Sequence, residues 1–222
     1  TIGFACAHSA ASVPHKLSEW DADFAFWCSY KHLNGGPGSP AFLYINRRHF
    51  NRTPGLAGWF GFEKSRQFDM SLEFDHARSA GGWQIGTPAV LSASALLPAL
   101  EIFEQAGMDR VREKSLALTD FLMEIIDREL SAPPYSYSAG TPRDRTRRGG
   151  HLAVEHEEGW RICQALKRRR IIPDFRPPRV IRLAPVALYN TFADVAETAL
   201  ALKEIIDNKE YEAFSPERDA VS

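Results

Sequence analysis

The spacing of apolar positions along the chain predicts strands in the front part. Three short apolar runs are expected to form them: TIGFACAH at the start, DADFAFWCSY at 21–30 and AFLYINRRHF at 41–50. The first two have no polar alternation, so we interpret both as buried strands, and the second as part of a parallel sheet. The stretch 51–87 has weak periodicity and many Gly, Pro and polar residues, which indicates a functional loop region.

Helical periodicity begins at Pro88. Apolar residues recur at three- and four-residue steps over 88–107, and Pro88 and Gly107 suit the first turn and the end of a helix. Pro98 inside this run predicts a kink or a break. A second helix is predicted over 108–129. Its inner side is expected to consist of Val111, Leu116, Leu118, Phe121, Leu122 and Ile125.

The rear part has a different organisation. The segment 131–150 is rich in Pro, Ser, Gly and Arg, and we interpret it as a linker or a long exposed loop. Thr191 is the expected N-cap of a final helix, with Asp194 three residues on in a near capping-box pattern. The elements predicted beyond the linker are a strand at 151–155, a helix at about 157–169, strands at 171–175 and 179–184, and a helix at 191–207.

These patterns together predict an α/β protein in two parts. Residues 1–130 are expected to form the rear part of a large α/β domain, and residues 151–222 a small α+β domain. The chain has 222 residues, of which 44% are hydrophobic and 25% charged, and this is an ordinary globular balance.

The charge of the chain argues against several kinds of partner. The formal net charge of −1 gives no electrostatic case for nucleic acid or an anionic membrane. No apolar run reaches the roughly 18 residues that a membrane span needs. The basic runs at 143–148 and 167–170 are interpreted as a solvated loop and a helix end. The seven histidines show no metal-binding spacing, so no metal site is expected.

The cysteines predict free thiols. Cys6, Cys28 and Cys163 are far apart and form no C-x-x-C pair, which favours small buried thiols in a reducing compartment. We therefore expect a cytoplasmic location. Cys28 lies three residues before Lys31, but it is interpreted as a small buried hydrophobe and not as a nucleophile.

Lys31 is the candidate for chemistry that the residues themselves suggest. It follows the apolar run that ends in Tyr30, so it is expected at the carboxyl end of a strand, where open α/β sheets bind ligands. A lysine in a partly dry pocket can have a lowered pKa and act as a Schiff-base nucleophile. The following NGGPG lets the backbone pass close to a ligand. On the residues alone, an ordinary solvated lysine is the more common outcome.

Four motifs in order carry a resemblance to a known family. CSYKHLNGGPGSPAFLYI, LAGWFGFEKSRQFDM, QIGTPAVLS and VIRLAPVALYNTF together resemble kynureninase, a fold-type I enzyme that depends on pyridoxal phosphate (PLP). The resemblance runs from about Ile2 to the final helix and corresponds to the carboxyl-terminal half of the family only. It implies an aspartate aminotransferase-like, PLP-dependent transferase fold and a homodimer. The implied reaction is hydrolysis of L-kynurenine, or 3-hydroxykynurenine, to anthranilate and L-alanine in tryptophan catabolism and NAD biosynthesis.

The resemblance assigns roles to residues near the first two motifs. Lys31 matches the lysine that forms the Schiff base with PLP and removes the α-proton of the substrate. Tyr30 matches a tyrosine that reaches the cofactor phosphate, and His8 a histidine close to the cofactor. Their structural alternatives are a strand-end tyrosine and a buried core histidine. Ala5 departs from the family, which has an aspartate there to hold the pyridine nitrogen protonated.

Three further residues acquire roles in the same way. Trp59 in GWFG and Thr87 in GTP match phosphate-binding residues that the family supplies from the neighbouring subunit. Arg182 in IRLAP matches the arginine that pairs with the substrate's α-carboxylate, a bidentate role that suits guanidinium. The alternatives are a packed loop tryptophan, a helix N-cap and a surface strand arginine.

Two other functions stay open. Ala5 and the match to half of the family favour a truncated or degenerate kynureninase-like protein without catalysis, acting as a dimerising module or surviving as a gene fragment. Another fold-type I PLP enzyme, such as a desulfurase or an aminotransferase, is less favoured, because GWFG and RLAPVALYN fit kynureninase better.

Overall fold

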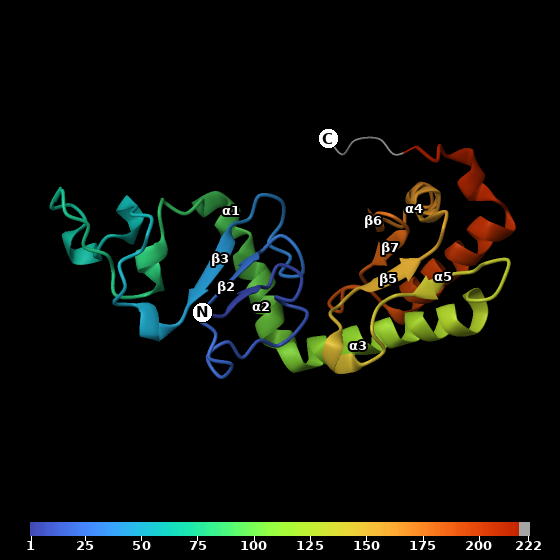
Figure 1. The fold of residues 1–222 in the computed structure, drawn as a ribbon, viewed down its shortest axis with the longest axis horizontal. Coiled ribbons are helices and arrows are strands. Elements are labelled where there is room, and N and C mark those ends of the chain that lie inside the picture. The colour runs from blue at the N-terminus through green and yellow to red at the C-terminus, as the bar shows by residue number, and fades with distance from the viewer. Residues whose placement is uncertain (218–222) are drawn as a thin grey trace. The chain divides into compact units, whose positions relative to one another are not determined.

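The computed structural model describes residues 1–217 and consists of two compact units, which divide between Met108 and Asp109. Figure 1 shows a small sheet in the first unit and a helix-covered sheet in the second. Each unit is described separately below.

A three-stranded mixed sheet forms the centre of the first unit. Its strands are β1 (Gly3–Ala5), β2 (Phe24–Cys28) and β3 (Ala41–Ile45). β1 and β2 run parallel, as predicted for the second run, whereas β3 pairs with β2 in the antiparallel sense.

The predicted burial of the first two strands is wrong. β1 is exposed along its whole length, and Ala25 is the buried residue of β2. Phe26 and Leu43 lie directly opposite each other on β2 and β3, and both side chains are exposed. The apolar runs thus form strands with a small core, in which Cys6, Ala10 and Ala25 are buried and Trp27 and Tyr44 pack against them.

The helical run after Pro88 forms two helices in place of one. α1 (Val90–Ser94) and α2 (Leu96–Ala106) are separated at Ala95, and α2 ends at Gly107 as predicted. The break that Pro98 predicted is therefore present, three residues before the proline. Pro98 lies in the first turn of α2, where a proline's missing N–H costs no intrahelical hydrogen bond.

The second unit is built on a four-stranded antiparallel sheet of order β4-β5-β7-β6. Its strands are β4 (Ser138–Ala139), β5 (Leu152–Glu155), β6 (Asp174–Arg176) and β7 (Val180–Leu183). Its helices are α3 (Met108–Ile125), α4 (Gly159–Arg168) and α5 (Phe192–Asp207). The predicted order of strand, helix, two strands and helix is confirmed, although β6 begins three residues later than expected.

One face of this sheet is buried and the other is not. Leu152 and Val154 of β5 and Ile181 of β7 are fully buried, whereas the residues between them are partly exposed. The buried face joins α3, α4 and α5 in one apolar core, to which Leu118, Ile162 and Leu202 belong. Side chains alternate between the faces of a strand, so Arg182 lies on the face away from this core.

The apolar face of α3 explains where the units divide. Val111, Leu118 and Leu122 are buried as predicted, whereas Leu116, Phe121 and Ile125 are only partly buried. Leu118 and Leu122 belong to the core of the second unit. The division therefore falls at the start of α3, while the sequence pattern placed the linker after this helix, at 131–150.

The basic run at 143–148 is not entirely solvated, and this part of the interpretation is wrong. Arg148 is 5% exposed and pairs with Asp120 of α3. Its guanidinium also donates to the carbonyl oxygen of Arg143 at 2.9 Å. From α3, Arg112 donates to the carbonyl oxygens of Arg145 and Arg148, each at 2.8 Å. These bonds hold the loop against α3.

The predicted cap of the last helix is confirmed as a complete capping box. The backbone N–H of Asp194 donates to Thr191 Oγ1 at 3.2 Å, and the N–H of Thr191 donates to the Asp194 carboxylate at 2.7 Å. Two backbone donors at the helix start thus acquire partners.

The three cysteines are free thiols, as predicted. Cys6 and Cys163 are buried, whereas Cys28 is half-buried. Burial raises the pKa of the Cys163 thiol to about 12, so the thiol stays protonated. Among residues 1–217, no helix combines the length and apolar character that a membrane crossing requires, and no cluster of side chains suits a metal ion.

Two leucines of α5 test the assignment of the core. Leu202 is fully buried, whereas Leu200 is 53% exposed on the same helix. We expect Leu202→Ala to lower the free energy of unfolding by about 2–5 kcal/mol, because it leaves a cavity. Leu200→Ala, the matched control, is expected to change it by less than about 0.5 kcal/mol. Chemical denaturation followed by circular dichroism measures both, and equal losses would contradict the assignment.

Candidate active site

Two parallel strand ends bring predicted site residues to one edge of the first sheet. The N–H of Cys6, just after β1, donates to the Phe26 carbonyl of β2 at 2.8 Å. His8 follows the end of β1 and Lys31 the end of β2, so both segments leave the sheet at the same edge. His8 is exposed, which excludes the alternative of a buried core histidine.

Lys31 is half-buried and lies beside an aromatic ring. Its Nζ is 5.7 Å from the centroid of the Tyr30 ring, within the range of a cation–π contact. The Tyr30 ring is 53% exposed. A hydrogen bond with Cys28, and then the electrostatic interaction with the same side chain, raise the pKa of the Tyr30 phenol. A raised pKa keeps the phenol protonated, so it stays a hydrogen-bond donor.

The turn after Lys31 is closed by hydrogen bonds. Ser29 is fully buried, and its Oγ lies 2.8 Å from Ser39 Oγ and 2.6 Å from the Pro40 carbonyl oxygen. Gly36 and Gly38 have φ of +81° and +75°, a left-handed conformation that favours glycine. The NGGPG stretch is therefore a fixed turn that holds the backbone next to Lys31.

Trp59 and Thr87 lie in two loop segments that pack on each other. The N–H of Phe60 donates to the Ile85 carbonyl oxygen at 3.4 Å, which joins the GWFG and QIGTP segments. Both Trp59 and Thr87 are exposed. Thr87 is not a helix N-cap, because α1 has Ala89 in that position and no side-chain cap. Pro88 correspondingly lies before the first turn of α1.

The loop pair and the lysine turn form separate groups of predicted residues. The Trp59 ring packs edge-on against Phe68, with centroids 5.5 Å apart, and the Trp59 carbonyl accepts from Gln67 at 3.0 Å. Within residues 1–217, no hydrogen bond or ring contact of Trp59 reaches Lys31. Trp59 and Thr87 therefore lie on the surface of the first unit, in loops that make no such contact with Lys31 among the described residues.

Arg182 belongs to the second unit, on the non-core face of its sheet. On β7 it lies between Ala153 of β5 and Asp174 of β6. Its side chain is 22% exposed and forms an ion pair with the Asp174 carboxylate. Arg176 pairs with the same carboxylate at 2.9 Å. Arg182 is therefore not an isolated surface arginine, as the structural alternative supposed.

Sequence reasoning missed Asp174. Asp174 and Arg182 are eight positions apart in the sequence, and this spacing belongs to no motif that would predict an ion pair. The signal lies in the register of the β6–β7 hairpin, which sets Asp174 directly opposite Arg182. Residues directly opposite each other in an antiparallel pair have Cβ atoms within about 5.5 Å. Pairing the predicted strands residue by residue would have found it.

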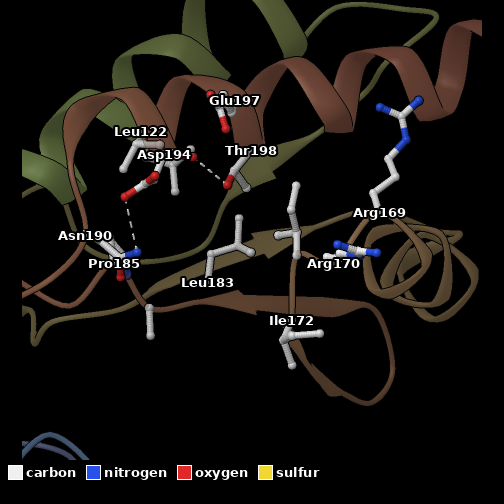
Figure 2. Close-up of a pocket in the computed structure, with 13 residues that line it drawn as sticks. Leu122, Arg169, Arg170, Ile172, Leu183, Pro185, Asn190, Asp194, Glu197 and Thr198 are labelled. Atoms are coloured by element: carbon white, nitrogen blue, oxygen red, sulfur yellow. Dashed lines mark hydrogen bonds between the residues drawn. The ribbon is translucent and has the colours of Figure 1, made fainter.

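A pocket of about 390 Å³ in the second unit is a different place from this ion pair. Figure 2 shows it between the end of β7 and the start of α5, with Leu183, Pro185 and Asp194 among its lining residues. Leu183 points to the core face of the sheet, whereas its neighbour Arg182 points to the other face. The guanidinium of Arg182 thus does not line this pocket.

Comparison with known families defines the class of protein. The profile of the aminotransferase class-V family matches residues 6–147, more than half of the chain. The chain therefore belongs to the aminotransferase class-V family. The profile of the kynureninase C-terminal domain matches residues 111–202. Both matches agree with the predicted resemblance to the carboxyl-terminal half of kynureninase, which is confirmed.

Curated relatives give the same result over the whole chain. Proteins named kynureninase from Geobacillus thermodenitrificans (strain NG80-2) and Shouchella clausii (strain KSM-K16) are 51% and 53% identical to it over 221 residues. The alignments cover 100% of this chain but 51% of each relative. The chain thus spans about half the length of the curated relatives it matches.

Solved structures support the predicted fold class. The apo cysteine desulfurase of Thermococcus onnurineus NA1 matches with a TM-score of 0.75 at 20% identity, over 93% of this chain and 52% of that chain. A cystine C-S lyase in complex with cysteine persulfide matches with a TM-score of 0.70 at 18% identity, over 87% of this chain and 49% of that chain. At such identities the likeness concerns the fold alone. The α/β, PLP-dependent transferase type is confirmed.

The packing of the two loops can be tested through Gly58. A Cβ at Gly58 would lie 2.2 Å from the Ile85 carbonyl oxygen, whereas a Cβ at Gly86 would meet nothing within 4 Å. We expect Gly58→Ala to displace the GWFG segment and destabilise the first unit by about 1–3 kcal/mol. Fluorine NMR of fluorotryptophan-labelled protein, with the Trp59 signal assigned through Trp59→Phe, reports the displacement. The control Gly86→Ala should leave that signal in place, and an unmoved signal in Gly58→Ala would refute the packing.

Proposed function

We propose that this chain provides the carboxyl-terminal half of a kynureninase-type active site. In this proposal the site hydrolyses L-kynurenine, with PLP as cofactor, to anthranilate and L-alanine. The observation that carries the proposal is the place of Lys31 after β2, at the edge that β1 and β2 share, in a chain about half identical to kynureninases. By its motif, Lys31 matches the lysine that forms the Schiff base with PLP in the family.

The side chains present fit two parts of PLP. Lys31 offers an amine for covalent attachment to the aldehyde carbon, and Tyr30 offers a phenol whose raised pKa keeps it a donor to phosphate. Trp59 and Thr87 add an exposed indole N–H and an exposed hydroxyl. The pyridine nitrogen is the part without a partner, because Ala5 places a methyl group where the family has a carboxylate.

PLP, when bound, supplies an electron sink for charge that develops at the substrate. In the proposal, side chains of the protein bind the substrate and transfer its proton. Arg182 would bind the α-carboxylate with its guanidinium and so align the bond to be broken. Lys31 Nζ would take the proton from the substrate's α-carbon. The overall reaction would break the Cβ–Cγ bond with one water, whose hydroxyl goes to the γ-carbonyl carbon to give the carboxyl group of anthranilate and whose proton goes to Cβ to give L-alanine.

The exposed loops and sheet surface support an assembly of more than one chain. Trp59 and Thr87 match residues that the family supplies across a subunit boundary, and both face outward here. Phe26 and Leu43 form an exposed apolar pair on the sheet. We therefore propose a homodimer that works in the cytoplasm, in tryptophan catabolism and NAD biosynthesis. The proposed substrate is L-kynurenine or 3-hydroxykynurenine.

A non-catalytic, kynureninase-like module is the second candidate. Ala5 favours it, because a charge-assisted hydrogen bond to the pyridine nitrogen is worth about 1.5–3 kcal/mol. Losing that amount from a transition state slows a reaction by about tenfold or more. Such a module would keep the outward-facing loops for assembly and lack turnover.

Attachment of PLP to Lys31 tests the proposal first. We expect the chain with added PLP to show a visible absorbance band that borohydride reduction converts to a stable adduct on Lys31, located by peptide mass mapping. Lys31→Ala should abolish the band. Lys16→Ala is the matched control, because Lys16 is an exposed lysine of the same unit that pairs with Glu19 at 3.1 Å. A band that survives in Lys31→Ala would overturn the proposal.

Restoring the missing carboxylate tests whether Ala5 limits catalysis. Ala5 is exposed at the end of β1, so an aspartate has room there. We expect Ala5→Asp to raise anthranilate production from kynurenine by about tenfold or more, because a paired pyridine nitrogen stays protonated. Ala5→Asn, equal in size and uncharged, should stay below it. Anthranilate fluorescence measures both rates, and equal rates in the two variants would show that Ala5 is not the limit.

A further inference from the structure

The non-core face of the second sheet carries a row of three side chains across neighbouring strands. Ala153 of β5, Arg182 of β7 and Asp174 of β6 lie directly opposite one another in the register. Arg182 therefore has a carboxylate on one flank and only a methyl group on the other. The Arg182 side chain is 22% exposed, so its environment is partly dry.

Asp174 holds one edge of the Arg182 guanidinium. Nη2 of Arg182 donates to Oδ2 of Asp174. Within residues 1–217, Nη2 is the one side-chain nitrogen of Arg182 with a hydrogen bond to another residue. A guanidinium has five N–H donors in a rigid fork, and a carboxylate takes two of them in parallel. The remaining donors of Arg182 can thus receive a second carboxylate.

Arg176 offsets the charge of Asp174. Its Nη1 lies 3.1 Å from Oδ1 of Asp174 and its Nη2 lies 2.9 Å from Oδ2, so it contacts both oxygens. Two guanidinium groups and one carboxylate leave a net charge of about +1 on the cluster. Without Arg176, a ligand carboxylate would approach an ion pair of no net charge.

We propose that Asp174 is a positioning residue that orients Arg182 toward a ligand carboxylate, with Arg176 keeping the cluster positive. This inference rests on the proposed role of Arg182 as the arginine that binds the substrate's α-carboxylate. A competing interpretation predicts the opposite effect on carboxylate binding when Asp174 is removed. If Asp174 only competed with the ligand for Arg182, its removal would strengthen carboxylate binding, whereas loss of a positioning residue weakens it.

The first experiment measures L-kynurenine binding by the full chain loaded with PLP. We expect Asp174→Asn to raise the dissociation constant and KM by about tenfold while kcat changes less than about twofold, because one charge-assisted bond that orients Arg182 is lost. Asp174→Glu should recover part of the affinity. Glu155→Gln is the matched control, since Glu155 lies on the same face and pairs with Arg179 at 3.0 Å. Unchanged or tighter binding in Asp174→Asn would overturn the inference.

The second experiment needs neither PLP nor turnover. NMR of the arginine Nε–H groups, with the Arg182 signal assigned by its loss in Arg182→Lys, is followed while sodium benzoate is added as a simple carboxylate probe. We expect the resolved Arg182 signal to shift with benzoate, and to broaden in Asp174→Asn with about tenfold weaker benzoate binding. Arg176→Gln should weaken benzoate binding while the Arg182 signal stays resolved.

The two experiments separate the inference from the proposed function. If the unmodified chain takes up no PLP or no kynurenine, the proposed function fails, and the benzoate titration still decides the role of Asp174. An Arg182 signal and a benzoate affinity that are both unaltered in Asp174→Asn would refute the positioning role. Asp174 is 40% exposed, so Asp174→Asn is compatible with folding, which far-ultraviolet circular dichroism verifies.

Discussion

The parallel pairing of β1 with β2 is the constraint on which the candidate active site depends. Parallel strands end at the same edge, so this pairing brings the segment with His8 and the segment with Lys31 together although they are far apart in the chain. The buried Ser29 and the left-handed glycines then fix the turn that carries Lys31. An antiparallel pairing of the same two strands would send these segments to opposite ends of the sheet.

The two units differ in how much of the apolar surface of their sheets they bury. The second unit buries one face of its sheet under three helices and keeps polar chemistry on the other face, where Arg182, Asp174 and Arg176 meet. The first unit leaves large apolar side chains of its sheet, such as Phe26 and Leu43, exposed. An exposed apolar surface of this kind is typical of sites of protein contact, and it is the observation that supports the proposed homodimer.

Local patterns predicted most elements, because their causes lie within a few residues. The capping box of Thr191 and Asp194 is an example, since both bonds join residues three apart. The features that the sequence did not predict depend on contacts between residues far apart in the chain. The burial of Arg148 requires Asp120, which lies 28 residues away on α3, and the exposure of β1 depends on what covers the sheet. The helix breaks at Ala95, before Pro98, because a helix tolerates proline in its first turn but not in its interior.

The candidate site could be predicted residue by residue only where a motif carried the family resemblance. Lys31 and Arg182 were found in this way, whereas Asp174 becomes visible only when β6 and β7 are aligned. Their roles as site residues stay predictions, because they rest on motif matches.

In the proposed function, covalent attachment of PLP and catalysis with it depend on different residues of this chain. In the part of the chain that the structure describes, Lys31 Nζ lies over the Tyr30 ring and the Lys31 carbonyl oxygen accepts a hydrogen bond from the Asn34 N–H, and neither contact involves Ala5. The amine that would bond PLP is therefore held independently of the position that would protonate its ring. A chain of this kind can keep the covalent attachment while losing the electron sink. Under the proposed function, attachment alone would therefore not distinguish an enzyme from a non-catalytic relative, whereas the residue at position 5 is expected to do so.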